Sequence, residues 1–205
     1  MQKEWDAIAD AWDEHRTTTS STLPLFLPHL QGIILDAGCG NGRNAREMAK
    51  NAATVMALDA SAAMLEKAKK NLEGLKNIQI IHAGMQEIPV ADRRVEAVVC
   101  LAAFHHLRPA EQPAALAEFF RVLKTRGVLC LTVWNRQQRR FKNGSKERDV
   151  PWDGRPRYYY FFDEGELTAL LQAAGFRVEE IFYEKNGQSV VPAEGQNLCL
   201  VARKP

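Results

Sequence analysis

The chain has 205 residues, 46% of them hydrophobic and 25% charged, and its formal net charge is +2. This balance is typical of an ordinary globular protein, and it excludes a disordered or fibrous chain and one that binds its partners through a large overall charge. No run of about 18 apolar residues occurs, and residues 1–10 mix charged with apolar groups, so we expect no membrane span, no secretory signal and a cytoplasmic location.

The N-terminal segment, residues 1–30, is predicted to form helices that cap a pocket, because Trp5, Ile8, Ala9 and Trp12 share one helical face. A chain of this length fits a single domain, residues 1–205. Its four cysteines are widely spaced and have no companion histidines at zinc-ligand spacing, so no metal site is predicted.

From Gly32 onward, apolar β-branched runs alternate with amphipathic stretches. This pattern predicts a Rossmann-like α/β fold, a doubly wound sheet with helices on both faces. The runs expected to form central parallel strands are residues 33–37, 54–59, 78–82, 95–102 and 127–134. Two later runs, 177–183 and 197–202, are too close in sequence for a parallel crossover and are predicted to pair antiparallel. Ser61 is the expected N-cap of the helix after the second strand.

The first strand runs into a glycine-rich turn, Asp36-Ala37-Gly38-Cys39-Gly40-Asn41-Gly42, and then into a helix. Glycines let the backbone turn sharply and approach a ligand closely. A dinucleotide fingerprint needs a further glycine where Arg43 stands, and Asp36 would repel a pyrophosphate. The Asp36 carboxylate can instead accept hydrogen bonds from the ammonium group of an amino-acid moiety, directly or through water.

Asp59 closes the second strand about 20 residues further on, the position from which an acidic side chain receives ribose hydroxyls in such folds. Together, Asp36 and Asp59 are predicted to bracket a nucleoside that carries an amino acid. The alternative is a structural strand-turn-helix corner with two incidental aspartates.

The Asp36-Ala37-Gly38-Cys39-Gly40 run resembles the first motif of class I methyltransferases, and the resemblance extends from about Trp5 to the end of the chain. It implies S-adenosyl-L-methionine as cofactor and a seven-stranded sheet of order 3-2-1-4-5-7-6 whose last strand is antiparallel. The expected cofactor-binding residues are Asp36, Gly38, Gly40, Asn41, Asp59, Ala60, Met64, Met85 and Leu101. The family often has an acidic residue where Gly84 stands, so Gln86 or the backbone is expected to contact the adenine amino group here.

The motif Phe104-His105-His106-Leu107 follows the fourth strand at its carboxyl end, the edge at which open α/β sheets bind ligands. His105 is predicted to contact the methyl acceptor, and a satisfied loop histidine is the alternative. Adjacent histidines point in different directions, so they do not indicate a metal site, and one of the two is expected to donate to the backbone.

Residues 135–162 form a conspicuous insertion, irregular over 135–156, in which arginines are interleaved with aromatic residues. Between Arg136 and Arg148 lie six basic residues and one acidic residue, counting both ends. Guanidinium groups pair with phosphates and rings stack on unpaired bases, so the pattern favours an RNA-binding loop over a solvated charged loop. The candidate substrate-binding residues are Arg136, Arg139, Arg157 and Tyr158.

Several segments resemble the tRNA wobble-uridine methyltransferases, which esterify 5-carboxymethyluridine and in animals are fused to an AlkB-type dioxygenase. These segments are Gly38-Cys39-Gly40-Asn41-Gly42, His105-His106-Leu107, Val150-Pro151-Trp152 and Arg157-Tyr158-Tyr159. The family's early Arg-Tyr-x-x-Trp-Pro pattern survives only as Arg16 and Pro24. The resemblance implies tRNA as substrate and a small zinc-binding activator subunit as partner.

A carboxylate acceptor is already ionised at neutral pH, because carboxyl groups titrate near pH ~4. The enzyme then needs no general base and acts by aligning the acceptor and excluding water. His105 and Arg16 are the candidate catalytic residues, and Arg16, Arg136 and Arg139 are expected to hold the acceptor or its phosphates. Two alternatives stay open: a methyltransferase for a quinone or other small metabolite, and a non-catalytic, methyltransferase-like RNA-binding subunit.

Overall fold

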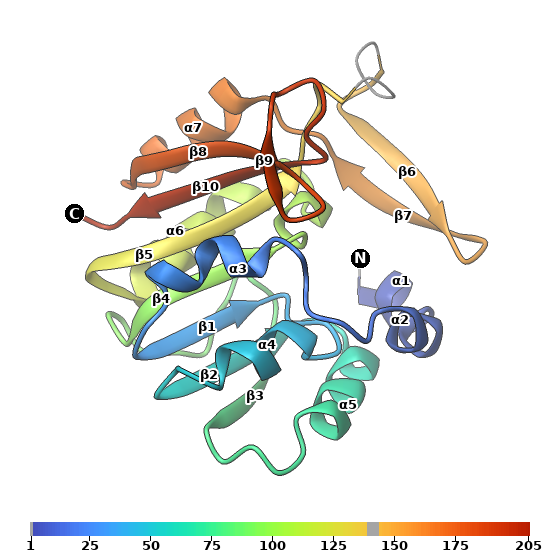
Figure 1. The fold of residues 1–205 in the computed structure, drawn as a ribbon, viewed down its shortest axis with the longest axis vertical. Coiled ribbons are helices and arrows are strands. Elements are labelled where there is room, and N and C mark those ends of the chain that lie inside the picture. The colour runs from blue at the N-terminus through green and yellow to red at the C-terminus, as the bar shows by residue number, and fades with distance from the viewer. Residues whose placement is uncertain (1, 139–143) are drawn as a thin grey trace.

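Five strands form the parallel part of a central sheet in the computed structural model, which describes residues 2–138 and 144–205 (Figure 1). They are β1 (Ile33–Ala37), β2 (Thr54–Asp59), β3 (Ile78–His82), β4 (Val95–Leu101) and β5 (Leu123–Trp134). Their order is β3-β2-β1-β4-β5, and every neighbouring pair is parallel. All five predicted strands are present, so the sequence pattern located the part of the sheet that carries the nucleotide motif.

The other end of the sheet is antiparallel. Strand β10 (Asn197–Arg203) pairs with β5 and with β8 (Arg177–Lys185), and β9 (Gln188–Val190) pairs with the outer edge of β8. In the described residues the sheet therefore has eight strands, ordered β3-β2-β1-β4-β5-β10-β8-β9. The predicted number of seven strands is wrong because the edge strand β9 was not predicted. The cause is local: Asn186 and Gly187, with φ of 53° and 81°, make a two-residue turn that folds β9 back onto β8.

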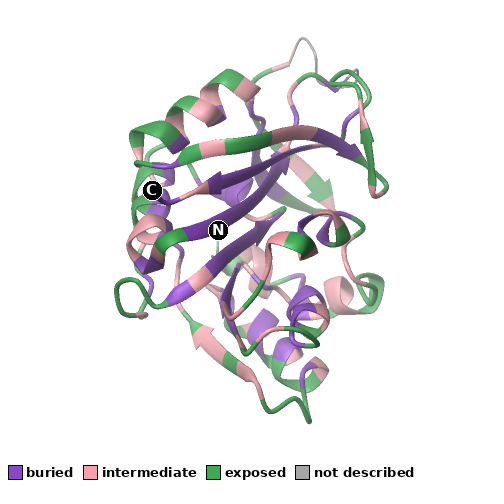
Figure 2. Ribbon diagram, turned by 60° about the vertical axis from the view of Figure 1, so that its left-hand side comes forward, coloured by how far each residue is buried: buried purple, intermediate pink, exposed green. Residues whose placement is uncertain are grey.

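Helices cover both faces of the sheet. One face packs against α3 (Leu23–Phe26), α4 (Arg43–Met48) and α5 (Ala62–Asn71), and the other against α6 (Gln112–Val122) and α7 (Glu164–Ala173). The strands between these layers are mostly buried (Figure 2). Ser61 accepts a hydrogen bond from the Met64 amide at 3.1 Å, which confirms the predicted N-cap of α5.

A two-stranded hairpin lies outside the main sheet, formed by β6 (Glu147–Trp152) and β7 (Arg155–Tyr160). The expectation of an irregular segment over residues 135–156 is therefore wrong for its second half. Asp153 and Gly154, with φ of 49° and 70°, form a two-residue hairpin turn. Pro151 and Pro156 face each other across the two strands, and prolines within a run argue against a strand at the sequence level.

The N-terminal residues form two short helices, α1 (Gln2–Asp6) and α2 (Ala9–His15), which we call the cap. The cap packs on α5 and lies beside the hairpin (Figure 1). The short 3-10 helices η1 (Leu27–His29) and η2 (Phe104–His106) complete the elements of the described residues.

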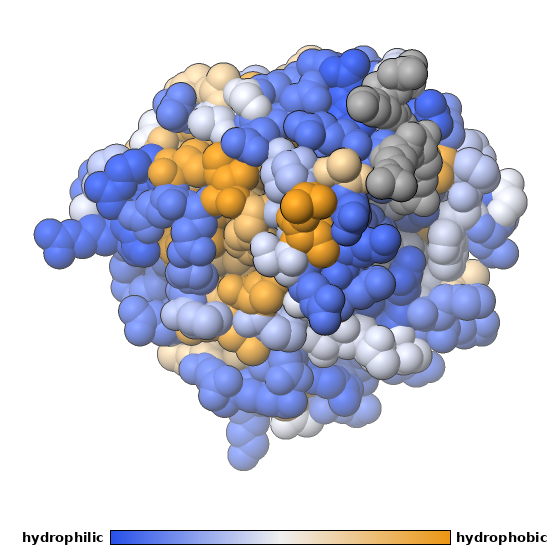
Figure 3. Space-filling model, turned by 45° about the horizontal axis from the view of Figure 1, so that its top comes forward, coloured by the Kyte–Doolittle hydropathy of each residue, from blue (hydrophilic) through white to orange (hydrophobic). Residues whose placement is uncertain are grey.

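Hydrophobic surface on the face seen in Figure 3 is confined to patches between hydrophilic areas. Leu75 and Val191 are the exposed large hydrophobic residues of the part that the structure describes. Within that part, no helix combines the length and apolar character needed to cross a bilayer.

Candidate active site

A cavity of about 450 Å³ opens at the carboxyl ends of β1, β2 and β4, between the sheet edge, the cap and the hairpin. Of the 15 candidate catalytic, cofactor-binding and substrate-binding residues, eleven line it: Arg16, Gly38, Gly40, Asn41, Asp59, Ala60, Met64, Met85, Leu101, His105 and Arg157. The fold thus brings together residues that are up to 141 positions apart in the chain. Asp36, Arg136 and Tyr158 are not among the lining residues, and Arg139 lies outside the described residues.

The glycine turn holds the Asp59 carboxylate at the cavity wall. Gly40 adopts a left-handed φ of 56°, and its amide donates to Asp59 Oδ2 at 2.8 Å. Asp59 Oδ1 accepts from the Ser61 amide at 2.9 Å. Because a carboxylate oxygen can accept more than one hydrogen bond, both oxygens keep capacity for hydroxyl donors in the cavity. Burial raises the pKa of Asp59, although these amides oppose the shift.

Gly38 is required for close packing rather than for space around a ligand. Its φ is 80°, and a Cβ at this position would lie 2.5 Å from the Cβ of Ala103. At Gly40 the nearest atom to such a Cβ is Trp12 Nε1, at 3.8 Å, so this glycine faces open space below the cap.

Asp36 is buried directly behind the glycine turn, at the end of β1. It is 2% exposed, and its Oδ2 has no hydrogen-bond partner among the described residues. Burial, followed by the charge of Asp59, raises the pKa of Asp36 to about 7. A buried carboxylate without a partner is costly, so this position fits a cationic group supplied by a ligand.

Asn41 connects the cavity wall to the cap. Its Nδ2 donates to Asp13 Oδ1 at 2.8 Å and to the Arg16 carbonyl at 3.0 Å. Asp13 Oδ1 also accepts from Asn71 Nδ2 at 2.7 Å. Asn41 therefore positions the cap in addition to lining the cavity.

Gln86 occupies the space in which an acidic side chain at residue 84 would lie. A Cβ on Gly84 would meet Gln86 Oε1 at 2.8 Å. Gln86 Nε2 donates to Glu111 Oε1 at 3.1 Å, which orients the amide and leaves Oε1 as the acceptor beside the cavity. Gln86 therefore lines the cavity with an acceptor oxygen beside Gly84, and its contact with adenine stays a prediction.

His105 and His106 are neutral and have opposite tautomers. Burial holds the pKa of His105 well below its usual range and lowers that of His106 to about 3. The Trp134 amide donates to His105 Nδ1 at 3.2 Å, so the ring proton of His105 is on Nε2. His106 Nδ1 lies 2.7 Å from the Tyr158 carbonyl, which can only accept. The expectation that one of the two histidines donates to the backbone is therefore confirmed for His106.

The turn before these histidines has an unusual backbone. Ala102 follows β4 with a φ of 54°, which is uncommon for a residue with a side chain, and its amide donates to Thr132 Oγ1 at 2.8 Å. This bend turns the chain into η2 and places both histidines at the cavity.

Two predicted substrate-binding residues lie elsewhere. Arg136 forms an ion pair of 2.7 Å with Asp163. Tyr158 is 5% exposed, and its hydroxyl donates to Glu147 at 2.9 Å. Arg136 therefore ties the start of the insertion to Asp163 just beyond its end, and Tyr158 joins the two strands of the hairpin.

Sequence reasoning missed several lining residues. The Ser/Thr-rich segment 18–22 and Glu184 belong to the wall, although neither carries a recognisable motif. Glu184 accepts from Ser21, Thr22, Gly187 and Asn197, so it fastens the N-terminal segment to the end of the sheet. The four threonine and serine residues after Thr18 show no helical or strand periodicity. In the sequence they are therefore only a weak indication of a loop near a ligand.

Comparisons with known proteins agree with this geometry. Residues 34–127 match a family model described as a methyltransferase domain. A methyltransferase-family protein of Encephalitozoon cuniculi is 30% identical over 160 residues, which cover 72% of this chain and 71% of that protein. A protein of Mycolicibacterium smegmatis named as an S-adenosylmethionine-dependent methyltransferase is 31% identical over 174 residues; these cover 80% of this chain but only 63% of the relative.

Solved structures share the fold. A Haloferax volcanii methyltransferase in complex with the Trm112 activator matches with a TM-score of 0.77 and 19% identity, covering 100% of this chain and 97% of that chain. The chain belongs to the class I S-adenosylmethionine-dependent methyltransferases. Its cofactor is therefore S-adenosyl-L-methionine.

Proposed function

We propose that the cofactor lies along the glycine turn with its charged and polar groups on Asp36, Asp59 and Gln86. The amino-acid end would neutralise Asp36, whose Oδ2 lacks a partner. The two ribose hydroxyls would donate to Asp59, and the adenine amino group to Gln86 Oε1. Ala60 and Met64 supply apolar wall on the adenine side of the cavity.

We further propose that the methyl acceptor is a carboxylate. The observation that carries this proposal is that, among the described residues that line the cavity, none outside the proposed cofactor contacts is a free general base. His105 and His106 are neutral with depressed pKa values, and Glu184 is occupied by four donors. A carboxylate needs no base, since it is ionised at neutral pH.

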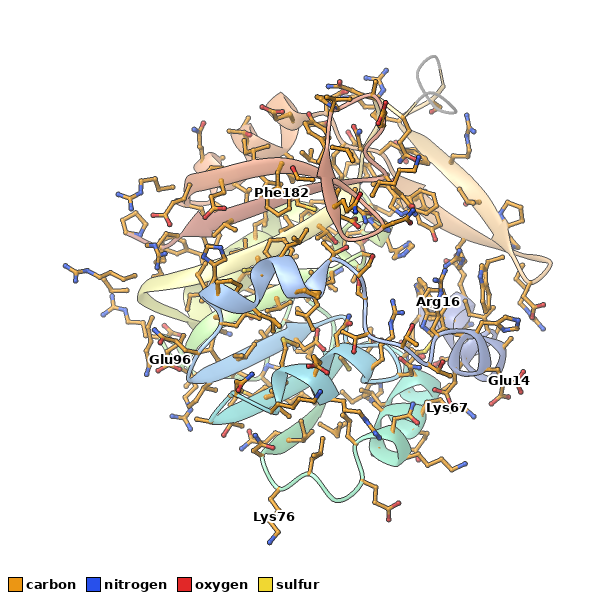
Figure 4. All side chains as sticks on the ribbon, viewed as in Figure 1. Glu14, Arg16, Lys67, Lys76, Glu96 and Phe182 are labelled. Carbon is orange, nitrogen blue, oxygen red and sulfur yellow. The ribbon has the colours of Figure 1, made fainter. Side chains whose placement is uncertain are left out.

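The chain's own residues then act by positioning the acceptor and the cofactor. When bound, S-adenosyl-L-methionine would supply an electrophilic methyl group: the acceptor oxygen would form the O–C bond, and the electron pair of the broken C–S bond would return to sulfur. The cap and hairpin exclude water, and His105 Nε2–H donates to the acceptor. Arg16, which directly follows α2 (Figure 4), is an exposed residue that lines the cavity and attracts anions toward it.

Our proposed acceptor is the carboxylate of 5-carboxymethyluridine at the wobble position of tRNA. It is supported by the motifs that resemble the wobble-uridine methyltransferases and by the similarity to a structure that contains a Trm112 activator. A small zinc-binding activator is the partner we propose on the same grounds. A malonyl-[acyl-carrier protein] O-methyltransferase of Geobacter sulfurreducens, 29% identical over 156 residues, also supports a carboxylate, because a malonyl group carries one.

The direct test is transfer of labelled methyl to tRNA that carries 5-carboxymethyluridine, with tRNA lacking that group as control. We expect label in the modified tRNA alone and its loss in mild base, as for an ester. Base-resistant label would contradict the ester. Label in a small metabolite but not in tRNA would favour the alternative suggested by a demethylmenaquinone methyltransferase of Clavibacter sepedonicus, 29% identical over 137 residues. Failure to bind the cofactor would favour a non-catalytic subunit.

A further inference from the structure

Arg157, on β7, is a buried cation without a hydrogen-bonding partner. The residue is 5% exposed, and its Nε is buried and unsatisfied. Among the residues that the structure describes, no carboxylate pairs with this guanidinium. Buried arginines are normally paired, because an unsatisfied buried donor is costly. The side chain lines the cavity, so a bound ligand can provide the missing acceptor.

Aromatic rings hold this guanidinium in place. Its Cζ lies 5.3 Å from the Trp5 ring, 5.5 Å from Trp12, 5.5 Å from Trp152 and 5.1 Å from Tyr159. Trp5 and Trp12 belong to the cap, and Trp152 and Tyr159 to the hairpin. Ring faces attract the positive charge, but they provide no conventional acceptor for its N–H groups. We call these four residues the aromatic cage.

The cage adjoins the place where a methyl acceptor has to lie. The Tyr159 ring that contacts Arg157 also stacks on His105, with centroids 5.1 Å apart. The two carboxylates on the cavity wall do not neutralise Arg157, because Asp59 is held by backbone amides and Glu184 by side chains and the Gly187 amide. Arg157 and His105 therefore contact the same tyrosine ring and line the same cavity.

We propose that Arg157 is the specificity-determining residue of an acceptor subsite for a carboxylate, with His105 Nε2–H as its second donor and the aromatic cage as its walls. This inference deepens the proposed function, because it rests on the cavity being the acceptor site. The guanidinium fork can pair bidentately with either a carboxylate or a phosphate diester. A carboxylate is favoured because it is planar and the subsite is walled by flat rings, whereas a phosphate diester is tetrahedral.

Small carboxylates test the subsite without tRNA or turnover. Acetate, malonate and phenylacetate are titrated against their neutral amides of nearly equal shape, with S-adenosylhomocysteine present and salt held constant. Tryptophan fluorescence reports binding, because three of the four cage rings are tryptophans. We expect at least one carboxylate to bind ten times more tightly than its amide. Arg157→Met should remove this preference, whereas Lys76→Met, at an exposed position outside the cap and the hairpin, should retain it.

Arg157→Lys is a second variant that controls for loss of folding in Arg157→Met. It keeps the positive charge within the aromatic cage but lacks the planar guanidinium fork. We expect this variant to show a cooperative thermal unfolding transition, as a folded protein does, and a weaker preference for the carboxylate over its amide. Equal binding of every acid and its amide by the wild type would overturn the proposal, as would an unchanged preference in Arg157→Met. Tighter binding of dimethyl phosphate than of any carboxylate would overturn the carboxylate assignment. These outcomes are independent of methyl transfer to tRNA, so the two proposals fail separately.

Discussion

At the scale of single residues, burial of the Asp36 carboxylate is the main energetic cost of the cofactor site. Its pKa of about 7 means that its ionised form is disfavoured until a cation binds. A bound ammonium group would lower that pKa, so cofactor binding favours the deprotonated protein. The affinity should therefore rise with pH up to about 7 and level off above it.

Asp36→Asn should have two opposite effects, a lower affinity for the cofactor and a higher stability of the apoprotein. The amide cannot attract an ammonium group, so we expect cofactor affinity to fall roughly 10- to 100-fold at pH 8, in the range of a charge-assisted hydrogen bond. The folded pKa of Asp36 is raised, so its contribution to stability is lost as pH rises from about 4 to 7. The variant should therefore melt at a higher temperature than wild-type apoprotein at pH 8, with a smaller gain at pH 5. Calorimetry at both pH values measures both quantities, and unchanged affinity would contradict the ammonium contact.

His105 gives a second prediction at this scale, because its two nitrogens have separate roles. Gln places an N–H donor near the Nε2 position, whereas Asn can accept from the Trp134 amide but reaches no further. We expect His105→Gln to retain most of kcat/KM and His105→Asn to lose about tenfold, as for one hydrogen bond of about 1.4 kcal/mol. With saturating cofactor, so that the titration of Asp36 does not limit the rate, the wild-type kcat should show no histidine ionisation between pH 5.5 and 8. A kcat that rises through pH 6.5 under these conditions would instead identify a general base.

At the scale of elements, the cap is held to the core by a few polar contacts. Asp6 Oδ1 accepts from Ser61 Oγ at 2.6 Å, and Asp13 Oδ1 accepts from both Asn41 and Asn71. Asp13→Ala leaves two amide donors unsatisfied, at a cost of about 1–3 kcal/mol. We expect roughly tenfold weaker cofactor binding and altered fluorescence of Trp5 and Trp12. Glu14→Ala, at the exposed position labelled in Figure 4, is the matched control and should change neither. Equal effects of the two substitutions would contradict a docked cap.

The elements also show where sequence reasoning succeeds. Strands β1, β2 and β4 and the second half of β5 are apolar runs, because they are buried on both faces, and this burial leaves a readable pattern. The edge strand β3 is only partly buried but still contains three isoleucines. The hairpin β6–β7 leaves no such pattern, since its residues combine prolines and charges with a tyrosine run. The Asp153-Gly154 pair, which is typical of a two-residue hairpin turn, was the sequence feature that could have indicated this hairpin. Arg157 stood out in the sequence only as one of several arginines, because its isolation from carboxylates depends on contacts between the cap and the hairpin.

At the scale of the whole molecule, the net charge of +2 is too small to direct the chain to RNA. Attraction of a polyanion would have to come from exposed basic residues such as Arg16, which lines the cavity, and Arg155, which lies beside the hairpin turn. Each phosphate contact releases counterions, so the affinity for tRNA should fall steeply with salt. A small carboxylate held by Arg157 inside the cavity should depend on salt much less.

This contrast gives a prediction that separates the two kinds of acceptor. We expect Arg155→Ala to weaken tRNA binding and to reduce the slope of log affinity against log salt by about 1, as for one lost phosphate contact. Lys76→Ala removes the same charge from a loop well away from the cap and hairpin (Figure 4) and should leave the slope unchanged. Filter binding at four salt concentrations provides the measurement. If wild-type affinity for tRNA is flat with salt, or both variants act alike, RNA does not contact this side of the molecule, and a small carboxylic acid becomes the better acceptor.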